Sequence, residues 1–343
     1  MKTFVIAEIG VNHNGDLQLA LDLVDAAAAA GASAAKFQTF RADAITVKKA
    51  GTVAYQKNAA GSDDQHAMLR KLELSAKDHE TVAVHCAKRG IEFMSTAFDI
   101  QSLDLLCNLG IKRIKVPSGE VTNEPFLADF ARRGLPIILS TGMATLEEVR
   151  RAATVIESEW AKSGCLPDAA AALTILHCTS SYPTEFSDVN LRAMMTLAME
   201  LNRPVGYSDH TQGIFVAPLA VAMGAVVVEK HITLDRAMPG PDHASSIEPA
   251  ELAELVYNIA NVEKLLGDGV KVPRESEIEA RQLVRRGLKA ARDLAPGTVL
   301  EAADISILRP ATGLAPSRLG SILGSSLKRG LRAGEPILDD HLA

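Results

Sequence analysis

The fold is decided by residues 4–38, which read FVIAEIGVNHNGDLQLALDLVDAAAAAGASAAKFQ. Residues 4–9 and 34–38 are short apolar runs of the kind that form buried strands. Between them, Asp16 is placed to cap a helix whose apolar residues recur at helical spacing and which Gly31 ends. The stretch therefore predicts a strand, a crossover helix and a second strand, which is the repeating unit of a parallel sheet.

The same alternation continues along the chain to about residue 266. Capping-box spacing at Ser75 with Asp78, and at Thr145 with Glu148, predicts the starts of two further helices. Strands are predicted at residues 4–9, 34–38, 91–95, 113–117, 136–140, 173–178, 204–207 and 225–230. Eight such units in about 265 residues match an α/β protein of the (β/α)8 TIM-barrel type. An open doubly wound sheet would more often have fewer strands and a glycine-rich first turn, which this chain lacks.

The end of the chain has a different texture, with short apolar pieces separated by proline and glycine. We predict a catalytic barrel domain over residues 1–267, a polar linker over 268–284 and a small domain of short strands and turns over 285–343. A domain of about 60 residues is marginally stable alone, so we expect it to be stabilised by packing against the barrel or against a second subunit.

Composition narrows the class of protein. Hydrophobic residues make up 47% of the 343 residues and charged residues 23%, as in an ordinary globular protein with a large core. A net charge of −6 gives no reason to expect nucleic acid or an anionic membrane as a partner. The N-terminal apolar run is too short for a signal peptide, and no stretch is long enough to span a membrane. Four scattered cysteines without CxxC spacing favour reduced thiols in the cytoplasm.

Polar residues end all eight predicted strands. Active sites of (β/α)8 enzymes lie at the C-terminal ends of the strands, so we expect these side chains to meet in one catalytic mouth. Lysines, hydroxyl groups and the backbone N–H groups of Gly119 and Gly142 suit the binding of phosphate or carboxylate, which predicts an anionic substrate. The polar residues at these ends include Glu8, Lys36, Gln38, Lys115, Ser118, Glu120, Ser208, His210, Glu229, His231 and Asp242.

For single residues, a purely structural role is still compatible with the sequence. Lys115 follows Lys112 and Arg113 and is compatible with a solvated face, and Glu8 is compatible with a structural carboxylate paired with Lys36.

A metal site is also expected. His210 and His231 follow the seventh and eighth strands, which are neighbours in a barrel, so the two imidazoles could share one ion. Imidazole with oxygen ligands suits manganese or a similar divalent metal, and the absence of paired cysteines argues against structural zinc.

Seven ordered motifs along the chain resemble the sialic acid synthases, the family of the N-acetylneuraminate, legionaminate and pseudaminate synthases. They are AEIGVNHNG at 7–15, KFQT at 36–39, KVPSGE at 115–120, STGM at 140–143, SDHT at 208–211, EKH at 229–231 and GPDH at 240–243. The tail from Arg285 resembles the antifreeze-like (SAF) domain of that family, with RPATGL at 309–314 where the family often has RPGTGI.

The resemblance implies a condensation of phosphoenolpyruvate with an N-acetylhexosamine that yields a nonulosonic acid and phosphate. Residues 234–243 look more like the neuraminate and legionaminate branches than the pseudaminate branch. N-acetylmannosamine (ManNAc) and its 2,4-diacetamido-6-deoxy analogue both remain open as the sugar. The implied cofactor is a divalent metal, Mn²⁺ first, with Mg²⁺ or Co²⁺ as alternatives, and the implied assembly is a domain-swapped homodimer.

The resemblance also assigns roles. The chemistry of the implied reaction, rather than the motifs, adds Glu8, Lys36 and Glu120 as expected catalytic residues, with either Glu8 or Glu120 handling the water. The metal ligands would be His210 and His231. The residues expected to hold phosphoenolpyruvate are Lys115, Ser118, Ser180 and Ser208, and those expected to contact the sugar are Gln38, Tyr182, Asp242 and, from the partner subunit, Arg285. Arg286 competes with Arg285, because this chain reads Arg-Arg-Gly where the family usually has Arg-x-Ser.

Two other functions fit the sequence less well. Another phosphoenolpyruvate-condensing barrel, of the 3-deoxy-octulosonate phosphate or deoxyheptulosonate type, is not expected to carry the SAF tail. A non-catalytic carbohydrate-binding protein would not need polar residues at every strand end.

Overall fold

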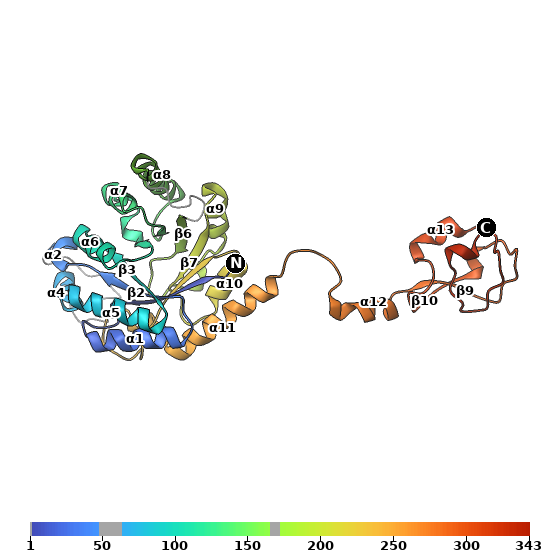
Figure 1. The fold of residues 1–343 in the computed structure, drawn as a ribbon, viewed down its shortest axis with the longest axis horizontal. Helices are drawn as coiled ribbons and strands as arrows, with labels where there is room; N and C mark the ends of the chain where they lie inside the picture. The colour runs from blue at the N-terminus through green and yellow to red at the C-terminus, as the bar shows by residue number, and fades with distance from the viewer. Residues whose placement is uncertain (1, 48–63, 165–171) are drawn as a thin grey trace. The chain divides into compact units, whose positions relative to one another are not determined.

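The computed structural model describes residues 2–47, 64–164 and 172–343. The chain divides into two compact units, Met1–Gly267 and Asp268–Ala343 (Figure 1). Within the described residues, no helix combines the length and the apolar character that crossing a membrane requires.

The first unit is a closed barrel of eight parallel strands that follow one another in chain order. The predicted fold class is confirmed, and each predicted strand lies within two residues of the observed one at both ends. The strands are β1 (Phe4–Gly10), β2 (Ala34–Thr39), β3 (Glu92–Ala97), β4 (Ile114–Val116), β5 (Ile137–Ser140), β6 (Leu173–Cys178), β7 (Val205–Asp209) and β8 (Val227–His231).

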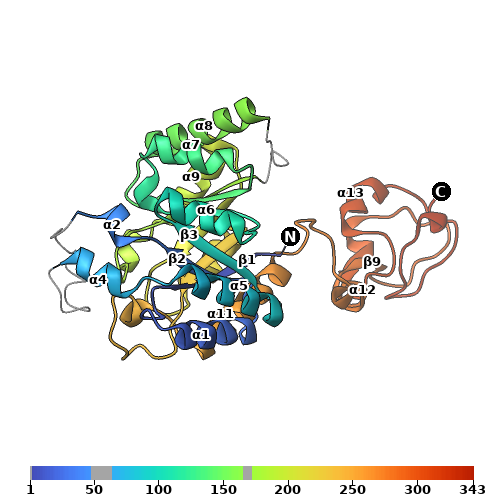
Figure 2. The same ribbon diagram turned by 60° about the vertical axis from the view of Figure 1, so that its left-hand side comes forward.

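Helices surround the barrel, and Figure 2 shows α1, α5 and α11 side by side on one flank. The predicted caps are confirmed: Asp16 accepts from the Leu19 N–H, and Ser75 and Thr145 each form a full capping box. The predicted insertion at 41–66 is described only at its ends, because 48–63 lie outside the described residues. The helices are α1 (Leu17–Ala29), α2 (Ala42–Ile45), α4 (Gln65–Lys71), α5 (Ala76–Arg89), α6 (Ile100–Asn108), α7 (Glu124–Arg132), α8 (Leu146–Ser163), α9 (Arg192–Leu201), α10 (Val216–Ala222) and α11 (Pro249–Leu266).

The interior of the barrel is filled by a layer of apolar side chains, one from each of six strands. These are Ile6, Ala34, Met94, Ile138, Leu176 and Val227. Successive residues of a strand point to opposite faces, so the residue two positions later also points inward, one step nearer the C-terminal mouth. Those next residues are Glu8, Lys36, Thr96, Ser140, Cys178 and Glu229. The floor of the site is thus built directly on the apolar plug.

The second unit has its own apolar core, formed by Leu288, Leu294, Leu300, Ile322, Leu331 and Ile337 among others. It contains α12 (Ile278–Val284), which falls in the predicted linker, and α13 (Leu319–Ile322). β9 (Gly287–Ala290) pairs antiparallel with β10 (Ile305–Leu308). At Gly287 a Cβ atom would lie 2.2 Å from the Thr312 carbonyl oxygen, so the glycine of the Arg-Arg-Gly sequence permits this close approach.

Candidate active site

A cavity of about 450 Å³ opens at the C-terminal ends of the strands. Ten of the residues predicted for the site line it: Glu8, Lys36, Gln38, Lys115, Ser118, Ser180, Tyr182, Ser208, His210 and His231. The other three lie elsewhere. Asp242 lines a smaller adjoining cavity, Glu120 lines a third cavity beside Asn123, and Arg285 belongs to the second unit.

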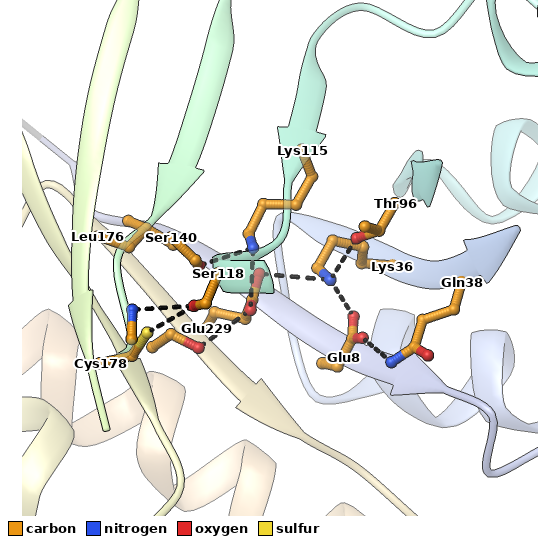
Figure 3. Close-up of polar contacts among 12 residues, drawn as sticks. Glu8, Lys36, Gln38, Thr96, Lys115, Ser118, Ser140, Leu176, Cys178 and Glu229 are labelled. Carbon is orange, nitrogen blue, oxygen red and sulfur yellow. Dashed lines mark hydrogen bonds and ion pairs between the residues drawn. The ribbon is translucent and has the colours of Figure 1, made fainter. Parts of the chain in front are cut away.

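Four buried charges alternate across the floor of the main cavity (Figure 3). Lys36 Nζ lies 2.6 Å from Glu8 Oε2 and 3.5 Å from Glu229 Oε2, and Lys115 Nζ lies 3.6 Å from Glu229 Oε1. The solvated-face reading of Lys115 is therefore wrong, because the residue is only 3% exposed. The Glu8–Lys36 pair exists, and both residues also face the cavity.

Burial and pairing act against each other on these groups. Burial alone would lower the pKa of Lys36, but the attraction of Glu229 and Glu8 raises it overall. Burial would likewise raise the pKa of Glu229, yet Lys115 and Lys36 hold it below its usual range. Glu229 therefore stays ionised between the two lysines.

Lys115 and Glu8, at the two ends of this charge chain, are less well compensated. Burial lowers the pKa of Lys115, although Glu229 opposes the shift. Burial raises the pKa of Glu8, although Lys36 opposes the shift. Lys115 is thus the cation with most to gain from an arriving anion, and Glu8 is the carboxylate best able to accept a proton.

A cradle of small polar groups lies beside Lys115. The Ser118 hydroxyl accepts a hydrogen bond of 2.9 Å from the Gly142 N–H. It also lies 3.3 Å from Cys178 Sγ (Figure 3). A Cβ atom on Gly142 would lie 2.2 Å from Ser180 Oγ, so only glycine lets the backbone approach both hydroxyl groups. Hydroxyl groups around a backbone N–H, next to a lysine, are an arrangement suited to binding an anion.

The two predicted metal ligands lie together on the wall of the cavity. His210 Nδ1 lies 2.7 Å from the Thr179 carbonyl oxygen, and a carbonyl only accepts, so the proton is on Nδ1 and Nε2 carries a lone pair. His231 Nδ1 has no hydrogen-bond partner among the described residues and lies 3.8 Å from Asp242 Oδ2. The two ring centroids are 5.6 Å apart, and the Tyr182 ring packs against both.

These imidazoles fit a divalent cation. Burial lowers the pKa of both His210 and His231, which keeps them in the neutral form that binds metals. No group of three or more histidine, cysteine or acidic residues is placed for a metal within the described ranges. The protein would then supply two nitrogen ligands, and water or substrate the remainder.

The three sugar contacts predicted in the barrel, Gln38, Tyr182 and Asp242, line adjoining cavities at the mouth. Gln38 Nε2 donates to Glu8 Oε1 at 3.2 Å, and burial raises the pKa of Asp242 to about 6. Gln38, Tyr182 and His231 line both the main cavity and the smaller cavity that contains Asp242. The two spaces therefore share a wall.

In the second unit, Arg285 and its competitor Arg286 line the same cavity of about 500 Å³, together with Arg281. None of the three arginines forms an ion pair with another described residue. Both candidates for the N-acetyl contact thus have unpaired guanidinium groups.

Two residues of the site were not assigned a role from the sequence. Glu229 was noted as a strand end, but its place between two lysines depends on strands that meet only across the barrel. Cys178 is one of the four scattered cysteines, for which the sequence predicts only reduced thiols, yet it lines the cavity. Counting two residues on from each inward-facing apolar residue would have found both.

The fold and the mouth define a (β/α)8-barrel enzyme with lysines and an anion cradle for an acidic substrate. Residues 23–271 match the NeuB family and residues 285–343 match the SAF domain. The chain belongs to the NeuB family, the sialic acid synthases that its motifs resemble, and the predicted family and enzyme class are confirmed.

Several relatives are similar over most of the chain. The chain is 51% identical to the N,N'-diacetyllegionaminic acid synthase of Legionella pneumophila over 343 residues, covering 100% of this chain and 95% of the relative. It is 44% identical to the Campylobacter jejuni protein of the same name, covering 98% and 99%. A solved N-acetylneuraminic acid synthetase from Leptospira borgpetersenii, in complex with citrate, is 35% identical, with a TM-score of 0.70 over 82% of this chain and 90% of that one.

Proposed function

We propose that the protein condenses phosphoenolpyruvate with a 2,4-diacetamido-2,4,6-trideoxymannose to form N,N'-diacetyllegionaminic acid and phosphate. The observation that carries the choice of sugar is the 51% identity, over the whole chain, to a protein named for that product. The solved relative named for N-acetylneuraminic acid is 35% identical. This difference favours the diacetamido sugar over ManNAc.

The reaction joins C3 of phosphoenolpyruvate to the aldehyde carbon of the open-chain sugar. Water then adds at C2, the C2–O bond to phosphate breaks, and the aldehyde oxygen gains a proton. Lys115 and the hydroxyl groups of Ser118, Ser180 and Ser208 would hold the phosphate and carboxylate. The Gly142 N–H would keep the Ser118 hydroxyl in place. Lys115 suits this role because its nearest carboxylate oxygen lies 3.6 Å away.

Glu8 would orient the water and take its proton. It lines the main cavity, and its raised pKa suits a general base near neutral pH. Lys36 keeps Glu8 in place at 2.6 Å. Glu120 is the weaker candidate, because it lines a neighbouring cavity and accepts a hydrogen bond from Asn123.

His210 and His231 would hold the divalent cation, Mn²⁺ first and Mg²⁺ or Co²⁺ as alternatives. Such an ion supplies Lewis-acid polarisation of the aldehyde oxygen. The ligand set is supported by the lone pair on His210 Nε2 and by the neutral His231 ring, whose Nδ1 has no hydrogen-bond partner in the described part of the chain.

The assembly belongs to the same proposal. In a domain-swapped homodimer, Arg285 of the SAF domain would serve the partner's mouth and recognise an acetamido group. Its support is the SAF match and the unpaired arginines of that unit. We also place the protein in the cytoplasm, which suits the free thiols of Cys86, Cys107 and Cys178.

The test is an assay of the purified protein with phosphoenolpyruvate, Mn²⁺ and either sugar, with phosphate release and product mass as readouts. We expect turnover with the diacetamido sugar and a product of the mass of N,N'-diacetyllegionaminic acid. Faster turnover with ManNAc would move the protein to the neuraminate branch. No phosphate release with either sugar would overturn the proposed reaction.

A further inference from the structure

A small cavity of about 170 Å³ adjoins the main cavity at its Gln38 side. One part of its wall is apolar and consists of Val11, Met68, Leu69, Leu72 and Pro241. Its other part is polar and includes Gln38, Tyr182 and Asp242, the three barrel residues predicted to contact the sugar.

The apolar wall is unusual for its place. Polar groups otherwise end the strands of this barrel, yet Val11, Met68 and Leu72 are at most 7% exposed and form, with Phe40, an apolar cluster separate from the barrel core. Met68 comes from α4 and Leu72 directly follows it, and the end of α4 presses on the loop after β1. There a Cβ atom on Gly15 would lie 2.4 Å from the Lys71 carbonyl oxygen.

Packing of α4 accounts for the cluster but not for the cavity that the described residues leave beside it. A cavity of about 170 Å³ is comparable to an engineered apolar cavity of about 150 Å³ that binds benzene. The space therefore has room for a group of several heavy atoms, and its lining requires that group to be polar at one end and apolar at the other.

We propose that this cavity binds the C4 acetamido group of the sugar, with the methyl against Met68 and Leu72 and the amide at Gln38 and Asp242. The inference rests on the proposed function, which supplies a sugar with two acetamido groups. The C6 methyl alone would leave most of the cavity empty. A C4 hydroxyl would fill less of it and leave the apolar wall without contacts.

The cavity would then set selectivity at C4. Wild-type kcat/KM should favour the 4-acetamido sugar over its 4-hydroxy counterpart by roughly 10- to 100-fold, the range expected when a shaped pocket loses the group that fills it. The two sugars to compare are 2,4-diacetamido-2,4,6-trideoxymannose and 2-acetamido-2,6-dideoxymannose, which differ only at C4.

The test fills the cavity. Leu69→Phe and, separately, Met68→Phe should lower kcat/KM for the 4-acetamido sugar by about 10-fold or more, while the 4-hydroxy sugar changes much less. KM for phosphoenolpyruvate should stay unchanged. Leu69 is only partly buried, so this variant has room to fold if Met68→Phe does not. Met195→Phe is the matched control, because Met195 lies on α9, is 50% exposed and lines neither cavity.

Saturation-transfer NMR gives a readout that does not need turnover. The C4 acetamido methyl of the bound sugar should receive more saturation from protein methyl groups than the C2 acetamido methyl, and Leu69→Phe should remove the difference. Equal saturation of the two methyl groups, or equal losses for both sugars in the filled variants, would overturn the inference. Retained saturation at C4 without phosphate release would instead uphold the cavity and overturn the proposed reaction.

Discussion

The carboxylate of Asp209 and the ammonium of Lys230 lie 3.0 Å apart, and neither side chain has exposed surface. Lys230 Nζ also donates to the Thr211 carbonyl oxygen, and the Thr211 N–H and hydroxyl donate to Asp209 Oδ1. Each residue of the pair precedes a predicted metal ligand, His210 or His231. Because neighbouring residues of a strand point to opposite faces, the pair joins β7 and β8 behind the mouth and fixes the two strand ends.

Breaking this pair should be costly. Lys230→Met leaves a buried carboxylate without its cation and should lower the free energy of unfolding by about 3–5 kcal/mol. The double variant with Asp209→Asn should recover most of the loss. Chemical denaturation measures both. Arg150→Met, which breaks the exposed pair with Glu147, is the control and should cost much less. Equal losses of stability in Lys230→Met and Arg150→Met would contradict the expectation that burial makes the Asp209–Lys230 pair costly to break.

His210→Ala and His231→Ala should each abolish tight Mn²⁺ binding and leave the fold intact, because residues on the cavity wall support chemistry more than packing. Mn²⁺ titration followed by electron paramagnetic resonance reads binding directly, and circular dichroism reads folding. His177→Gln is the control, because the His177 ring bonds to the Val189 carbonyl oxygen and does not line the cavity. Unchanged Mn²⁺ affinity in both alanine variants would remove the metal assignment.

Lys115→Met should weaken the binding of phosphoenolpyruvate. A charge-assisted contact to phosphate contributes about 1.5–3 kcal/mol, so KM for phosphoenolpyruvate should rise by roughly 10- to 150-fold. Steady-state phosphate release measures the change. Lys112→Met provides the matched control, since Lys112 is exposed and three residues earlier in the chain. A similar KM in the two variants would argue against a phosphate contact.

Asp242 should make stability depend on pH in the opposite sense to an ion-paired acid. Burial raises the pKa of Asp242 from 3.8 to about 6, so between these values the folded protein binds more protons than the unfolded chain. Stability therefore falls as pH rises through this window, by at most about 3 kcal/mol, and the penalty persists above it.

The neutral variant Asp242→Asn avoids that penalty. It should be more stable than wild type above about pH 6, with the difference shrinking toward pH 4. Denaturation curves of the metal-free protein at several pH values measure this, with Asp22→Asn on the exposed face of α1 as control. Parallel pH profiles for wild type and Asp242→Asn would contradict the expectation.

Mixing two impaired variants, assayed at phosphoenolpyruvate concentrations far below the KM of the Lys115 variant, tests the swapped assembly. Arg285→Ala and Lys115→Ala subunits, refolded together, should regain up to roughly a quarter of wild-type phosphate release, because about half of randomly paired dimers are mixed and each has one intact site. Each variant refolded alone is the control. No regain, with mixed dimers verified by native mass spectrometry, would mean that Arg285 does not serve the partner's site.

The sequence predicts the barrel closely because each buried parallel strand is a short apolar run, and such a run can be recognised from neighbouring residues alone. Ile6 and Glu8 illustrate this: an apolar residue faces the interior, and two positions later a charged residue faces the mouth. The Glu8–Lys36 pair can also be predicted from the sequence, because β1 and β2 are consecutive strands and therefore neighbours in the sheet.

What the sequence did not reveal depends on contacts between distant strands and segments. Glu229 on β8 lies between Lys36 on β2 and Lys115 on β4, and local periodicity does not encode how those three strands face one another across the barrel. The cavity beside α4 depends on the path of the connection between β2 and β3, which composition does not fix. The first feature comes from closure of the barrel, and the second from the way a connection packs beside its mouth.

The apolar wall on α4 has a consequence for how such enzymes diversify. The charged groups of the floor are carried by barrel strands, whereas Met68 and Leu69 belong to a helix of seven residues in a connection outside the barrel. Connections tolerate sequence change far better than strands do. A library restricted to Met68, Leu69 and Leu72 could therefore alter the accepted sugar while the inherited catalytic apparatus stays untouched, which makes this helix the natural starting point for engineering new nonulosonic acids.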